Sequence, residues 1–306
     1  MTPFARLLGN RIALGGAIAI FLVAGTARAQ TTTKGAVRAP ARTSPSNIAT
    51  ISVEEALQLT KKSPKDSHAY LALGGAYRRA GRYQDAVSAF QRTVALDPNN
   101  STAHVSLGAV YMDLKRPEDA EREFRKALKL NPNDPGAHFN MGNFYLGKGR
   151  RDDALGEFRK ATELTPPLAD AWVSVALIEG ELGKTDDAVQ HYQKALAIDS
   201  TNVRALTNLG NARYTQLRYP EATDLYRKAL RYDPRNQEAN YNLGIAFADA
   251  QIFKQALAYW KRVVEIDSTT QVAETAKSSV QILEDFLNAQ QGKQVQRPTG
   301  VTTEKH

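Results

Sequence analysis

The sequence contains no cysteine. Disulfide bonds, thiolate metal sites, lipid attachment at a cysteine and catalysis by a cysteine nucleophile are therefore excluded. The chain also lacks the His-Glu-x-x-His spacing of zinc hydrolases and the Gly-x-Ser-x-Gly turn of serine hydrolases. We accordingly expect no catalytic residue, no cofactor and no enzymatic activity.

Histidines are also scarce, and only five occur: His68, His104, His138, His191 and His306. His104 and His138 lie 34 residues apart, and the simplest interpretation is that both pack within helices. A metal shared by these two is the alternative, but no carboxylate stands at a spacing that would complete such a site. We therefore expect no bound metal.

A segment that resembles a phosphate-binding loop runs from Gly180 to Thr185. It ends in Gly-Lys-Thr, as those loops do, but its first glycine is two residues too close to the second. No strand is expected before it, so we predict that the segment is a turn between helices.

Long apolar runs are absent except near the N-terminus, where residues 12–26 follow Arg6 and Arg11 and precede Ala27-Arg28-Ala29. This is the pattern of a Sec-type signal peptide. The run is shorter than the ~20 residues that cross a bilayer, so retention as an anchor is the less favoured alternative. We expect cleavage between Ala29 and Gln30, and a periplasmic or secreted protein without a membrane span.

A basic excess is present, but it belongs to the ends of the chain. Nine of the 40 basic residues and one of the 32 acidic residues lie outside residues 51–290, which leaves 31 of each inside. A neutral body does not favour nucleic acid or a membrane surface as a partner.

What the sequence does contain is a 34-residue period that runs from residue 67 to residue 270 without insertion or deletion. Apolar residues recur at helical spacing in both halves of each unit, which predicts two amphipathic helices per unit. The six units, called repeats 1 to 6, are 67–100, 101–134, 135–168, 169–202, 203–236 and 237–270.

Each recurring residue type has a predicted mechanical role. A small residue on the first helix allows close approach of a neighbouring helix. An alanine on the second helix forms the matching surface, and an aromatic residue fills the gap between consecutive units. Gly81, Gly149 and Gly183 are expected in the turn at positive φ, and prolines end the second helix. The small series is Gly74, Gly108, Gly142, Ala176, Gly210 and Gly244; the alanines are Ala86, Ala120, Ala154, Ala188, Ala222 and Ala256; the aromatics are Phe90, Phe124, Phe158, Tyr192, Tyr226 and Trp260; the prolines are Pro98, Pro132, Pro166 and Pro234.

These residues resemble the tetratricopeptide repeat family, and the resemblance covers 204 of the 306 residues, 67–270. It implies an all-α fold, a right-handed α-solenoid of six helix-turn-helix repeats. Departures from the family pattern are mild: Glu179 and Arg213 occupy the position of the aromatic residues Tyr77 and Tyr111, and Ser200 and Ser268 occupy the position of the proline.

The segments outside the repeats have predicted roles too. Residues 51–66 begin with the capping box Ser52-Val53-Glu54-Glu55 and are expected to form an N-terminal half-repeat helix. Residues 271–290 carry one apolar stripe and are expected to form a C-terminal capping helix. Residues 30–50 and 291–306 have little to bury, so we predict a disordered linker and a disordered tail.

The resemblance also implies a binding surface, because in the family the free face of the first helices lines a concave groove that receives peptides or partner helices. On this chain that face carries asparagines, whose amides can both donate and accept, and apolar residues between them. An alternative interpretation is that these asparagines are ordinary helix-surface residues. The predicted groove residues are Asn140, Asn143, Asn208, Asn211, Asn242, Phe139, Val173 and Tyr241.

The leading hypothesis is a scaffold or adaptor in the cell envelope that binds a protein or peptide of unknown identity. A self-associating component of an envelope, pilus or secretion assembly, and therefore a homo-oligomer, is the second hypothesis. The third is an accessory subunit of a separate transferase or hydrolase.

Overall fold

A computed structural model describes residues 51–164 and 167–295, with the backbone alone from residue 291 onward. The predicted signal peptide, the linker 30–50 and residues 296–306 lie outside the described residues, as does Pro166. The chain divides into two compact units at residues 200 and 201. We call the described residues 51–200 the first unit and residues 201–295 the second unit.

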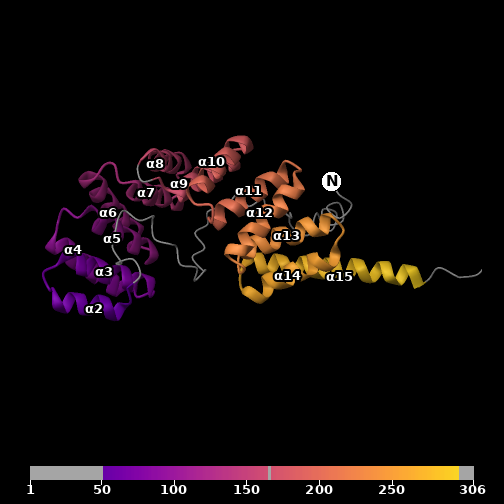
Figure 1. The fold of residues 1–306 in the computed structure, drawn as a ribbon, viewed down its shortest axis with the longest axis horizontal. Coiled ribbons are helices and arrows are strands. Elements are labelled where there is room, and N and C mark those ends of the chain that lie inside the picture. Colours follow the sequence, from indigo (N-terminus) through magenta and orange to yellow (C-terminus); the bar gives the residue numbers. More distant parts are fainter. Residues whose placement is uncertain (1–50, 165–166, 296–306) are drawn as a thin grey trace, which may run out of the picture. The chain divides into compact units, whose positions relative to one another are not determined.

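The described residues form 14 helices and no strand. Within each unit, consecutive helices lie side by side and pack in pairs, one pair in each 34-residue repeat (Figure 1). The first unit comprises α2 (Val53–Lys62), α3 (Ser67–Arg79), α4 (Tyr83–Leu96), α5 (Ser101–Asp113), α6 (Pro117–Leu130), α7 (Pro135–Gly147), α8 (Arg151–Glu163), α9 (Ala169–Glu181) and α10 (Thr185–Ile198); the second comprises α11 (Val203–Thr215), α12 (Tyr219–Tyr232), α13 (Gln237–Asp249), α14 (Phe253–Ile266) and α15 (Gln271–Val295).

The first helix of most repeats begins at an Asp or Asn that caps it. The side chain accepts a hydrogen bond from a backbone N–H of the first turn, which would otherwise have no partner. The predicted capping box at α2 is confirmed, because Ser52 and Glu55 each accept a hydrogen bond from the other's backbone. The five capping residues are Asp66, Asn100, Asp134, Asn202 and Asn236.

The turn inside each repeat reverses the chain through one residue at positive φ. Gly81, Gly149 and Gly183 adopt φ values of +72°, +74° and +77°, as predicted. The Gly180–Thr185 segment accordingly comprises the end of α9, the turn at residues 182–184 and the start of α10. Repeats 2, 5 and 6 make the same turn without glycine, using Lys115, Leu217 and Gln251.

The small residue of the first helix lies directly against the aromatic ring of its own repeat. A Cβ added at Gly74 would approach Phe90 to 2.5 Å, and one added at Gly142 would approach Phe158 to 2.6 Å. The glycines are needed because the ring occupies that space. The aromatic residue was expected between consecutive units, and it does share a core with the next repeat: Phe90 clusters with Leu107. Its direct contact with the glycine, however, is within one repeat.

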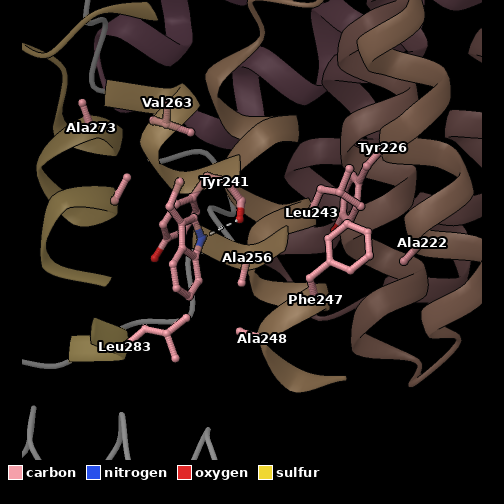
Figure 2. Packing of buried hydrophobic residues seen from close by; sticks show 12 residues of the cluster. Ala222, Tyr226, Tyr241, Leu243, Phe247, Ala248, Ala256, Val263, Ala273 and Leu283 are labelled. Carbon is pink, nitrogen blue, oxygen red and sulfur yellow. Dashed lines mark hydrogen bonds between the residues drawn. The ribbon is translucent and has the colours of Figure 1, made fainter. Parts of the chain in front are cut away.

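The core of the second unit ends under α15 (Figure 2). Trp260 of α14 is 1% exposed, and its Nε1 donates to the Tyr241 carbonyl of α13 at 3.1 Å. Ala273, Ala276 and Leu283 of α15 complete this core, so α15 covers the apolar side of the last repeat. The helix was expected to end at Gln290 with a disordered tail, but it continues to Val295.

No helix among the described residues is long and apolar enough to span a bilayer.

Candidate binding surface

The predicted groove face divides into three columns, each with one residue per repeat at 34-residue spacing. We call them the Phe139 column, the Asn140 column and the Asn143 column after their repeat 3 members. Their places in the structure differ: four of the six residues of the Phe139 column are buried, against three in the Asn140 column and one in the Asn143 column. The Phe139 column is Leu71, Val105, Phe139, Val173, Thr207 and Tyr241; the Asn140 column is Ala72, Ser106, Asn140, Ser174, Asn208 and Asn242; the Asn143 column is Gly75, Ala109, Asn143, Leu177, Asn211 and Ile245.

Phe139 and Tyr241 of the Phe139 column contact the element that follows their own repeat. Phe139 is half-buried against Ala171 at the start of α9, and its ring lies 5.6 Å from that of Phe158. Val173 is 0% exposed and Tyr241 is 6% exposed. The Tyr241 hydroxyl lies 3.3 Å from Ser279 Oγ of α15. Val173 and Tyr241 are therefore interior residues rather than groove residues, and we leave them out of the candidate surface.

In the first unit, Asn140 and Asn143 lie about one turn apart on α7 and are both half-buried. Asn140 donates one N–H to the Gly136 carbonyl of its own helix at 2.8 Å. Asn143 makes no hydrogen bond to another of the described residues. Leu177 is half-buried one repeat further on. Both amides therefore retain donor and acceptor capacity at a partly open surface.

In the second unit, Asn211 and Asn242 are joined to each other. Asn242 Nδ2 donates to Asn211 Oδ1 at 2.7 Å, and the Tyr226 hydroxyl donates to the same oxygen at 2.8 Å. Burial raises the pKa of Tyr226, which keeps its hydroxyl a donor. This network holds α11, α12 and α13 together. Asn242 is only 8% exposed, so it is an interior residue like Tyr241, whereas Asn211 is half-buried and has a structural role in addition to any binding role.

Asn208 remains more available than this pair. It is half-buried and donates one N–H to the Arg204 carbonyl at 2.9 Å. Its oxygen and second N–H make no hydrogen bond to another described residue. The structure thus brings Asn140 together with Asn143, and Asn208 together with Asn211 and Asn242.

His104 and His138 do not meet at a shared site. Each instead pairs with a glutamate on the second helix of its own repeat, His104 with Glu123 and His138 with Glu157, at 2.6 Å. Sequence reasoning missed these glutamates, although the same 19-residue spacing in two repeats was a signal for them. The described residues contain no group of three or more His, Asp or Glu side chains arranged to hold a metal.

The sequence matches two models of known protein families. A family model described as tetratricopeptide repeat matches residues 51–101, 71–138, 105–169 and 207–269. A second family model, described as TPR repeat, matches residues 176–216. The chain belongs to the tetratricopeptide repeat family. No curated protein matches it at a significant level.

Solved structures with a similar fold come from several systems. A chain of the APC/C hetero-tetramer Cut9-Hcn1 is 15% identical with a TM-score of 0.65, over 72% of this chain and 44% of that chain. PilF of Pseudomonas aeruginosa is 20% identical with a TM-score of 0.61, over 74% of this chain and 99% of that chain. PilW, described as a widely conserved type IV pilus biogenesis factor, is 20% identical with a TM-score of 0.57, over 68% of this chain and 97% of that chain. This tetratricopeptide repeat chain thus spans less than half of the Cut9-Hcn1 chain. At these identities the likeness shows the fold.

Proposed function

We propose that this tetratricopeptide repeat protein is a non-catalytic scaffold of the cell envelope that binds a segment of another protein on the Asn140 and Asn143 columns. The observation that carries the proposal is the unused hydrogen-bonding capacity of Asn140, Asn143 and Asn208 on the first helices. The main chain of an extended peptide presents alternating donors and acceptors, and an asparagine amide can bind both.

The surface also has an apolar part. Leu177 in the first unit and Ile245 in the second are half-buried members of the Asn143 column. Such a surface suits a peptide whose backbone forms hydrogen bonds with the asparagine amides and whose apolar side chain packs on the neighbouring half-buried apolar residue. The two units are proposed to bind through the same type of surface, each by itself.

Selection of a random peptide library on the purified chain tests this proposal. We expect peptides that bind the first unit to be lost when Asn140 and Asn143 are changed to alanine, and peptides that bind the second unit to be lost with Asn208→Ala. Asn211 is left unchanged, because it accepts hydrogen bonds from Tyr226 and Asn242 within the fold. The matched controls are Asn99→Ala and Asn288→Ala, which remove exposed asparagines outside the two columns. Enrichment of the same peptides by wild type, by the double variant and by Asn208→Ala would show that the columns are not the binding surface.

The envelope location rests on the signal-peptide pattern of residues 1–29. We expect the protein recovered from cells to begin at Gln30 and to be released with the periplasmic or secreted fraction. Mass spectrometry of its N-terminal peptide measures this, and an intact Met1 terminus in the soluble cell interior would refute it. The fold that it shares with PilW, a pilus biogenesis factor, is compatible with an assembly role in the envelope.

A further inference from the structure

Acidic residues recur at the end of the first helices, one turn beyond the Asn143 column. They occupy this position in repeats 2, 4 and 6, where each of them is half-buried. Because residues seven positions apart share a face of a helix, this position continues the face of the Asn140 column. We call the series the Glu181 column, and its members are Arg79, Asp113, Gly147, Glu181, Thr215 and Asp249.

Two of the three carboxylates of this column are bonded to the preceding repeat. Asp113 of α5 accepts a hydrogen bond from Arg78 Nε of α3 at 2.6 Å. Asp249 of α13 accepts one from the Tyr214 hydroxyl of α11. In both repeats the donor stands at the end of the preceding first helix, at the same place in the 34-residue period. These two acids therefore join neighbouring first helices.

Glu181 has no donor at the equivalent place. The residue there is Leu146, whose side chain cannot donate a hydrogen bond. Glu181 pairs instead with Arg151 at the start of α8, where Oε2 lies 3.2 Å from Arg151 Nε. None of the described residues donates a hydrogen bond to this carboxylate. Its oxygens therefore keep acceptor capacity for a ligand.

The charge of Glu181 is compensated only in part. Its side chain is 14% exposed, and burial raises the pKa of its carboxyl although Arg151 acts to lower it. Glu157 is buried to a similar degree, at 16% exposed, but has two cationic neighbours. Burial would raise the pKa of Glu157, but hydrogen bonds from His138 and Lys160 hold it below the ordinary value. A second cation beside Glu181 would likewise complete the compensation that one arginine leaves incomplete.

Glu181 also lies on the proposed binding surface. Ser174, Leu177 and Glu181 share one face of α9, and Leu177 is one turn from Glu181. In repeat 3 the same column has Gly147, where an added Cβ would meet nothing within 4 Å. The column is therefore open immediately before Glu181. Because Glu181 is the last residue of α9, the partial negative charge of the helix end adds to the attraction for a cation.

The other polar members of the column are used within the fold. Arg79 donates to the Ile51 carbonyl at 2.9 Å. Thr215 donates to carbonyls of its own helix. Asp113 and Asp249 accept the hydrogen bonds from the preceding repeats. Within the described part of the chain, Glu181 is thus the one carboxylate of this column that accepts no hydrogen bond.

We propose that Glu181 makes the first-unit surface selective for basic peptides, by binding a lysine or arginine next to the apolar side chain that packs on Leu177. This inference rests on the proposed function, because it assigns a chemical class to the segment that Asn140 and Asn143 bind. In the second unit both polar members of the column are bonded within the fold, so its ligands carry no such requirement.

The peptide selection supplies the probes for a test. Peptides that are lost with Asn140→Ala and Asn143→Ala but kept with Asn208→Ala are first-unit peptides. We expect them to share a lysine or arginine at one position. Calorimetry then measures the affinity of wild type and of Glu181→Gln for one such peptide and for its derivative with norleucine at the basic position. Norleucine keeps an aliphatic side chain and removes the charge.

The expected result is a strong coupling between Glu181 and the basic residue of the peptide. Each single change should weaken binding by about fivefold or more, and both changes together should weaken it no further. Asp187→Asn, which removes an exposed acid of the same repeat outside the columns, should bind like wild type. Glu181→Gln should unfold at the urea midpoint of wild type or above it, because burial disfavours the ionised carboxylate.

The outcomes distinguish this inference from the proposed function. Additive effects of the two changes, or first-unit peptides without a shared basic position, would overturn the selectivity of Glu181. The proposed function would stand in that case if Asn140→Ala with Asn143→Ala still abolished binding. Peptides that bound this double variant as tightly as wild type would overturn both.

Discussion

One residue in each repeat adopts left-handed backbone between the paired helices, yet only three of the six are glycine. The three glycines were predictable, since glycine is the usual residue at positive φ. The turns at Lys115, Leu217 and Gln251 were not predictable, because these residue types do not indicate a positive φ. Their conformation follows instead from the fixed length of the repeat, which leaves one position for the reversal.

Leu217 is the clearest case of local strain, because its φ is +61° and its side chain is 70% exposed. Left-handed backbone costs a residue with a Cβ about 1–2 kcal/mol. Glycine avoids this cost, but it loses more conformational entropy on folding, which offsets part of the gain. We expect Leu217→Gly to stabilise the second unit by about 0.5–1 kcal/mol in urea unfolding. The reverse change, Gly149→Leu, should destabilise the first unit, and equal stability of both variants with wild type would contradict the strain.

Thr207 has a buried hydroxyl that makes no hydrogen bond to any described residue, and the residue is 1% exposed. Replacement by valine keeps the shape and removes the unpaired hydroxyl. Thr207→Val should raise the free energy of unfolding by about 1 kcal/mol. Thr93→Val is the matched control, because the buried Thr93 hydroxyl donates to Ala89 at 3.2 Å. A gain for Thr93→Val as large as that for Thr207→Val would contradict this reasoning.

Glu157 predicts an acid response of the first unit. Its pKa lies below the ordinary value of 4.5, so its contribution is complete above that pH and disappears as the pH falls through the lowered pKa. Wild type should therefore exceed Glu157→Gln in unfolding midpoint at pH 7, with the difference shrinking toward pH 3. If the difference in unfolding midpoint between wild type and Glu157→Gln did not change with pH, the negative charge of Glu157 would not be its cause.

At the scale of helices, the sequence predicts the spacing between each glycine and each aromatic residue, but it does not predict which aromatic ring contacts which glycine. The period shows that Gly142 and Phe158 recur together, whereas the ring could point to its own repeat or to the next. Likewise, the Phe139 column looked accessible, because helical spacing alone does not say which side of a helix faces the following repeat. Val173 and Tyr241 were misplaced for that reason.

Gly142→Ala tests the contact between paired helices. The added Cβ would lie 2.6 Å from Phe158, so we expect a net loss of about 1–2 kcal/mol despite the better helix propensity of alanine. Gly156→Ala in α8 is the control, because its Cβ would meet nothing within 4 Å, and it should stabilise by up to about 1 kcal/mol. Phe158→Leu should relieve part of the Gly142→Ala loss, and strict additivity in this double mutant would contradict direct contact.

At the scale of the whole chain, the period predicted the all-α repeat architecture correctly because 34-residue spacing, small residues, alanines and aromatics agree in every unit. Charge balance within residues 51–290 was also readable. The division at residues 200 and 201 was not, because Ser200 replaces a proline in a loop whose length does not change.

The structure bears on the self-association hypothesis at the C-terminal end of the repeats. α15 packs its apolar side on α13 and α14 and exposes Glu274, Lys277, Gln281 and Asp285 on the other side. A polar outer face gives a second copy little apolar surface to bury at this end. Binding through the first-helix columns therefore remains the better supported proposal.

The most direct test of that proposal is the affinity of a selected peptide, measured by calorimetry. Asn140 and Asn143 are each expected to make about one hydrogen bond to the peptide backbone. We predict that Asn140→Ala with Asn143→Ala weakens binding of a first-unit peptide by about tenfold or more, with the unfolding midpoint unchanged. Asn99→Ala should bind like wild type. Wild-type affinity in the double variant would contradict the account.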